Sequence, residues 1–163
     1  MPNYIVSKID SFDLEKANAS RLLWVLHADK IPPHIGVSID GDFYSLKANG
    51  KDEGVSINGL LEIVNRRKIA TLCFELNSEL SQSSLVAEFD KFEKTIPNEI
   101  TCLRPIKNVL MKEHAAKLIE LLHMLDEDGQ IGAVMGININ ADFHGIQDYN
   151  VDAIHARLKQ LDK

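Results

Sequence analysis

The stretch Ile31-Pro-Pro-His-Ile-Gly-Val-Ser-Ile-Asp-Gly-Asp-Phe-Tyr-Ser-Leu46 decides the fold. Its two prolines end whatever precedes them, because proline fixes φ and holds the residue before it in extended conformations. Two β-rich runs follow, residues 34–39 and 42–46, and Asp40-Gly41 between them is a strong hairpin signal. In the first run, apolar residues alternate with a polar or small set: His34, Gly36 and Ser38. The stretch therefore predicts a β-hairpin with a histidine at its mouth, beside a glycine that permits close approach.

Length and composition fit one globular domain over residues 1–163. The chain is 45% hydrophobic and 26% charged, which is ordinary for a soluble domain with a sizeable core. Its formal net charge of −6 argues against nucleic acid or an acidic membrane as partner, because phosphate binding depends on Lys and Arg. The largest basic cluster, Arg66-Arg67-Lys68, ends a helical pattern, where cations stabilise the helix dipole.

The cellular compartment follows from what the sequence lacks. The N-terminus has no charged segment followed by an apolar one, so we expect no signal peptide. No apolar run approaches the ~18 residues of a transmembrane helix. The two cysteines, Cys73 and Cys102, do not make a disulfide framework. We therefore expect a cytoplasmic protein whose thiols are both reduced.

The spacing of apolar residues predicts the remaining elements. Helices are expected over residues 12–27 (with Ser11 as N-cap), 57–67, 85–94, 104–125 with a break near Lys112, and 151–161. Strands are expected over residues 4–6, 69–76, 100–103 and 131–139, and loops over 48–54, 77–84 and 142–149. Trp24 is expected in the core, and Gly132 and Gly136 mark a close backbone approach or a bulge. The alternation predicts a single layered α/β or α+β domain with a mixed sheet, including the hairpin, flanked by helices.

Cys102 and His34 are the first candidates for chemistry. Pro105 is tolerated only in the first turn of a helix, which places Cys102 at or just before a helix N-terminus. Exposed amides and the helix dipole lower the pKa of a thiol there. A neighbouring imidazole, His34, would take its proton, and Ser45 on the next strand would orient the imidazole. This hypothesis requires that the two side chains meet in space. The competing interpretation is a half-buried structural thiol and a histidine that follows a turn.

Residues 34–41, His-Ile-Gly-Val-Ser-Ile-Asp-Gly, resemble the histidine hairpin of the permuted NlpC-type papain-like cysteine hydrolases. In that superfamily the histidine strand precedes a cysteine at a helix N-terminus, and here His34 precedes Cys102. The resemblance implies that Cys102 is the nucleophile, His34 the general base and Ser45 the third, polar residue. The residues after Cys102 give no family signature.

A second resemblance uses the same residues. Residues 33–41 look like the strand and Asp-Gly start of the cis-prenyltransferases, and residues 71–76 echo a later core strand of that family. It would make Asp40 a Mg²⁺ and diphosphate residue. However, the asparagine and arginine that follow Asp-Gly in that family are replaced by Asp42, Phe43 and Tyr44, so we do not expect prenyl transfer.

Metal and cofactor motifs are absent from the sequence. The six histidines fall in no zinc spacing. The segment 126–131 imitates part of a calcium loop, but its first and twelfth positions are Met124 and Met135. No glycine-rich nucleotide loop follows a strand. We therefore expect no cofactor and no metal.

Two functions remain open at this point. The first is a cysteine-dependent hydrolase or acyl-transfer enzyme acting on a small-molecule or peptide substrate through His34 and Cys102. The second is a noncatalytic domain that binds a protein partner or a ligand. An enzyme needs the two side chains within hydrogen-bond reach in an open cleft, whereas a binding domain does not. The sequence leaves substrate, partner and oligomeric state open.

Overall fold

Six consecutive residues, Arg21–Leu26, form strand β3 at the centre of a seven-stranded sheet. The predicted helix over residues 12–27 is therefore wrong for most of its length. Only α1, Leu14–Asn18, is helical, and its N-cap is Asp13. The run Leu22–Leu26 is apolar at every position because helices cover both faces of the sheet around it, and such strands lose the usual alternation. Trp24 is fully buried, as expected.

The computed structural model describes residues 3–161, and its main sheet has the strand order β2-β8-β7-β3-β4-β5-β6. β2 and β8 are parallel, and every other neighbouring pair is antiparallel, so the sheet is mixed, as predicted. A separate two-stranded sheet pairs β1 with β9. The other strands are β1 Tyr4–Ile5, β2 Asp10–Ser11, β4 His34–Ile39, β5 Asp42–Lys47, β6 Gly50–Ser56, β7 Thr71–Leu76, β8 Ile131–Ile137 and β9 Gly145–Ile146.

The predicted hairpin is confirmed as β4 and β5. Its turn residues have positive φ, 49° at Asp40 and 87° at Gly41, as the Asp-Gly signal requires. The predicted loop over residues 48–54 is wrong, because most of it belongs to the edge strand β6. β6 carries the polar run Lys51-Asp52-Glu53-Gly54, which is typical of an edge strand that must not pair with another sheet.

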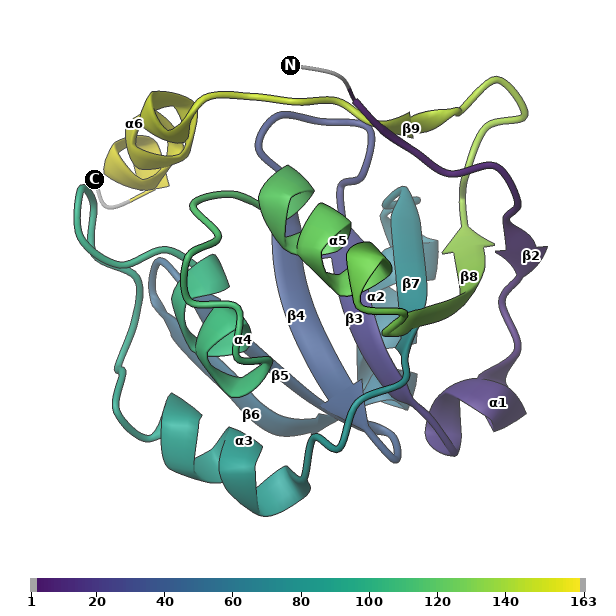
Figure 1. Cartoon of the computed structure of the whole chain (residues 1–163), viewed down its shortest axis with the longest axis horizontal. Coiled ribbons are helices and arrows are strands. Elements are labelled where there is room, and N and C mark those ends of the chain that lie inside the picture. The colour runs from purple at the N-terminus through teal and green to yellow at the C-terminus, as the bar shows by residue number, and fades with distance from the viewer. Residues whose placement is uncertain (1–2, 162–163) are drawn as a thin grey trace.

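Helices cover the two faces of the sheet unequally (Figure 1). α3, α4 and α5 pack on the front face, whereas α2 packs on the back. Alternate residues of β3 separate the two cores, since Leu23 and Val25 join the front core while Leu22 and Trp24 join the back core. The remaining helices are α2 Ile57–Arg66, α3 Gln82–Phe89, α4 Leu103–Val109, α5 Leu118–Glu127 and α6 Val151–Leu161.

The long helix predicted over residues 104–125 is two helices, α4 and α5, separated by a segment that includes Lys112, where a break was expected. The predicted third helix starts earlier than expected, because Ser81 rather than a later serine caps α3. No strand forms over residues 100–103, where Cys102 instead precedes α4. Among residues 3–161, none of the helices combines the length and the apolar character that a membrane crossing requires.

Candidate functional site

Two segments far apart in sequence, residues 4–11 and 135–146, are joined at two points and separate between them. β1 pairs with β9, and the Val6 N–H donates to the His144 carbonyl at 2.9 Å. Farther along, Asp10 and Ser11 pair with Met135 and Gly136 in the parallel β2–β8 ladder. Between these points, no backbone hydrogen bond joins the described residues 7–9 to residues 138–141. The two segments therefore enclose a gap, which we call the opening.

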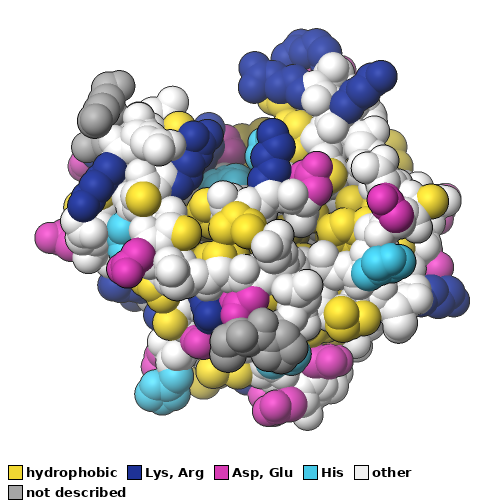
Figure 2. All heavy atoms as spheres, turned by 90° about the horizontal axis from the view of Figure 1, so that it is seen from above, with side chains coloured by type: hydrophobic (Ala, Val, Ile, Leu, Met, Phe, Trp, Pro, Cys, Tyr) yellow, Lys and Arg dark blue, Asp and Glu magenta, His cyan; other side chains and the backbone are white. Residues whose placement is uncertain are grey.

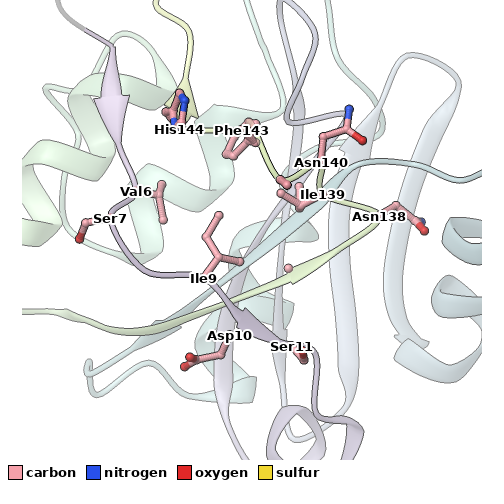
Figure 3. Close-up of a pocket in the computed structure, with 12 residues that line it drawn as sticks. Val6, Ser7, Ile9, Asp10, Ser11, Asn138, Ile139, Asn140, Phe143 and His144 are labelled. Atoms are coloured by element: carbon pink, nitrogen blue, oxygen red, sulfur yellow. The ribbon is translucent and has the colours of Figure 1, made fainter.

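The opening has a volume of about 550 Å³, which suits a small ligand. Figure 3 shows Val6, Ile9, Ile139 and Phe143 gathered around its middle, while the side chains of Asn138 and Asn140 point away from it. Val6 is buried, and the other three apolar side chains are partly buried against the front core. The opening therefore has an apolar floor that the main core holds in place.

Gly136 and Asn138 shape the β8 side of the opening. A Cβ atom on Gly136 would lie 2.7 Å from Cγ2 of Ile9 and 3.0 Å from Cγ1 of Ile139, so glycine allows the two isoleucines to close over the strand. Close approach, rather than a bulge, explains this glycine. Asn138 has φ of +57°, a conformation that asparagine tolerates better than most residues. Its amide donates to the carbonyls of Val64 and Ile69 at 3.1 and 3.2 Å, which fixes the end of β8 against α2.

The rim of the opening supplies hydrogen-bonding groups. Ser7 and Ile9 line the opening, and no backbone hydrogen bond joins the described residues 7–9 to residues 138–141. The carboxylate of Asp10 and the imidazole of His144 also line the opening. Most of the accessible lining of the opening is therefore polar, and the apolar side chains are confined to its middle.

His34 and Ser45, both predicted site residues, lie on the back side of the sheet. Gly36 and Ser38, on the same side of β4 as His34, contact the back core, where the Trp24 indole N–H donates to Ser38 Oγ at 2.8 Å. Ser45 Oγ donates to Asp52 Oδ2 at 2.9 Å, and Lys47 forms an ion pair with the same carboxylate at 3.0 Å. The carboxylate of Asp52 is thus held by two groups of β5.

The imidazole of His34 is neutral in this fold. Burial lowers its pKa to about 4, Asp52 acts in the opposite direction, and Lys47 and His27 add to the lowering. Its Nε2 atom is buried and has no hydrogen-bond partner among the described residues. With so low a pKa, the ring would not hold a proton taken from a thiol at neutral pH.

Cys102 lies directly before α4, as predicted, but on the front side of the sheet. It packs against the front core, to which Ile35 and Val37 of β4 belong. Burial raises the pKa of its thiol, and hydrogen bonds from the backbone of Ile35 and of Cys102 itself act weakly in the opposite direction. Because neighbouring residues of a strand point to opposite faces, the structure does not bring the side chains of His34 and Cys102 together.

No family model, no curated protein and no solved structure matches this chain. Within residues 3–161, no three His, Cys, Asp or Glu side chains are grouped so that they would hold a metal ion. Both cysteines are free thiols.

Alkylation of Cys102 by iodoacetamide tests its separation from His34. We expect Cys102 in a Cys73→Ala background to react at least about tenfold more slowly than a free thiol at pH 8, because burial limits access and reduces the thiolate fraction. His34→Ala should leave the rate unchanged. A fast reaction well below pH ~8.5 that slows in His34→Ala would contradict this geometry and restore the cysteine-enzyme hypothesis.

Sequence reasoning did not find the opening as a site. Its floor residues, such as Ile9 and Ile139, look like ordinary core positions, and nothing local links residues 6–11 to residues 136–144. Gly136 carries a sequence signal of this site, because a glycine within a strand indicates that another segment approaches closely. The sequence does not show that this segment is residues 6–11.

Proposed function

We propose that this protein is a noncatalytic binding domain whose opening holds a small ligand. The observation that carries the proposal is the opening itself, a hollow of about 550 Å³ between two segments that are hydrogen-bonded at both ends. Val6, Ile9, Ile139 and Phe143 would pack against an apolar group of the ligand. Backbone groups of Ser7 and Ile9, with Asp10 and His144, would bind its hydrogen-bonding groups.

The chemistry around the opening supports binding rather than turnover. No nucleophilic thiol lines it, since Cys102 lies beneath Pro33 and Tyr149 in a separate, small cavity. One carboxylate and one histidine line it, and both are more easily explained as hydrogen-bonding partners than as an acid–base pair, because no hydrogen bond joins them among the described residues. The expected ligand is a small molecule with an apolar group beside an amide or hydroxyl group.

A fragment screen by ¹⁵N NMR tests this proposal. We expect fragments with an apolar group and an amide to shift the backbone signals of residues 6–11 and 136–144 together. Ala141→Trp should fill the opening and weaken the best fragment at least about tenfold. Ala87→Trp, on the exposed side of α3, is the matched control and should bind as the wild type does.

Three results would refute the proposed function. The first is the absence of any fragment that shifts these two segments. The second is a set of hits that map elsewhere on the domain. The third is equal binding to the wild type and to Ala141→Trp, because a ligand in the opening must lose its space to the indole.

A further inference from the structure

A basic surface interrupts this otherwise acidic protein. The chain has a net charge of −6, yet Arg66, Arg67 and Lys68 are consecutive and exposed at the end of α2. The loop between β3 and β4 carries Lys30 beside them, because the Ala28 N–H donates to the Ala70 carbonyl at 2.9 Å. Arg157 of α6 lies near the same loop, because its positive charge lowers the pKa of His27, as that of Lys30 does.

These cations come from three segments that meet around His27 and Ala28: the β3–β4 loop, the chain that follows α2, and α6. Figure 2 shows Lys and Arg side chains on both sides of a recess in the top of the molecule, with histidine, acidic and apolar side chains between them. We call the surface formed by the exposed residues Lys30, Arg66, Arg67, Lys68 and Arg157 the basic recess.

The cations of the basic recess form no ion pair with the acidic residues that the structure describes. None of the ion pairs among the described residues includes Lys30, Arg66, Arg67 or Lys68. The carboxylate of Asp29 is the acidic group that acts on His27, so it offsets part of the positive charge. His27 also acts electrostatically on His34, whose buried Nε2 atom has no hydrogen-bond partner among the described residues. Unpaired cations held close together repel one another, and an anion between them would relieve the repulsion.

We propose that the basic recess binds a small, multiply charged anion that carries phosphate groups, held between Arg67 and Lys68 on one side and Lys30 and Arg157 on the other. Arginine binds phosphate oxygens through its planar fork, and lysine binds them as a point charge. The net charge of −6 favours a small anion over a long one, because a nucleic acid would extend from the recess onto acidic surface. This inference does not depend on the opening.

Isothermal titration with pyrophosphate at 150 mM NaCl tests the proposal in the full chain. We expect saturable binding that weakens about tenfold or more in Arg67→Gln/Lys68→Gln, and similarly in Lys30→Gln/Arg157→Gln. The control, Lys8→Gln/Lys91→Gln, removes two exposed positive charges elsewhere and should bind pyrophosphate as the wild type does. Circular dichroism should show that all three variants are folded, since each substituted side chain is exposed.

An NMR titration of His27 tests whether the anion binds at the basic recess. Pyrophosphate should raise the pKa of His27 in a ¹H–¹⁵N titration, because the anion would offset Lys30 and Arg157, which now lower it. The signals of residues 6–11 should stay in place, which separates this site from the opening.

Several outcomes would overturn the proposal. The proposal is wrong if 10 mM pyrophosphate does not bind. It is also wrong if the control variant loses as much affinity for pyrophosphate as the two recess variants, because overall charge would then explain the binding. Equal affinity for citrate would remove the preference for phosphate. Binding to phosphatidylglycerol vesicles without binding to pyrophosphate would show that the phosphate belongs to a membrane surface instead.

Discussion

Lowering the pH from 7 to 4 is expected to remove about 3 kcal/mol of folding free energy through His34 alone. The folded-state pKa of this histidine is lowered to about 4, and burial is the largest cause. Between pH 6.5, the ordinary value, and pH 4, the unfolded chain binds a proton at His34 while the folded chain does not. The contribution of neutral His34 to the free energy of unfolding is therefore complete above pH 6.5. It falls as the pH drops toward 4 and levels off below that pH.

Urea unfolding at pH 7, 6, 5 and 4 measures this effect in the wild type and in His34→Gln, which cannot titrate. The variant should lose about 3 kcal/mol less than the wild type over this range, whatever its stability at pH 7. His114→Gln, at an exposed position, is the control and should follow the wild type. If the free energy of unfolding of His34→Gln depends on pH as strongly as that of the wild type, His34 is not buried as a neutral imidazole.

Gly36→Ala should destabilise the domain by about 2–3 kcal/mol, because the new methyl group has no space. A Cβ atom there would overlap the ring of Phe43 and lie 2.9 Å from the carbonyl oxygen of Tyr44. The ring can move, but the carbonyl belongs to the β4–β5 pair and cannot. The glycine beside His34 thus serves the packing of Phe43 against Trp24, whose ring centroids are 5.9 Å apart, and not the approach of a ligand.

The matched substitution Gly59→Ala should act in the opposite direction. Gly59 lies in α2, and, apart from its chain neighbours and the backbone of its own helix, no atom lies within 4 Å of an added Cβ. Alanine restricts the unfolded chain and favours the helix, so we expect a gain of about 0.5–1 kcal/mol. Thermal and urea unfolding of both variants give the comparison. Equal effects of the two alanines would show that the Phe43 contact does not require a glycine.

The elements that depend on local chemistry could be predicted from the sequence, and those that depend on distant partners could not. The Asp40-Gly41 turn and α2 carry their own signals in turn chemistry and apolar spacing. The apolar residues of segment 12–27 recur near helical spacing, which predicts a helix. Because Leu22–Leu26 is apolar at every position, that spacing does not distinguish a helix from a buried strand, and pairing with β4 and β7 makes it a strand.

The relation between the side chains of His34 and Cys102 could not be predicted from the sequence for the same reason. Cys102 was correctly placed before a helix, and His34 at the start of a strand, from prolines and β-rich spacing. The face to which each side chain points depends on how α4 packs across the sheet, which spacing does not reveal. The opening needs residues 6–11 beside residues 136–144, a pairing that no local pattern encodes.

The pairing of β1 with β9 and of β2 with β8 also sets an order of events on the ribosome. Strands β3 to β7 contact one another within residues 21–76, so this part of the sheet can assemble while the chain is still being made. Residues 4–11 must wait until residues 135–146 have emerged, which is nearly the whole length of the chain. Contacts of such long sequence separation form slowly. A nascent chain that stalls before residue 135 would hold a nearly complete sheet but no opening.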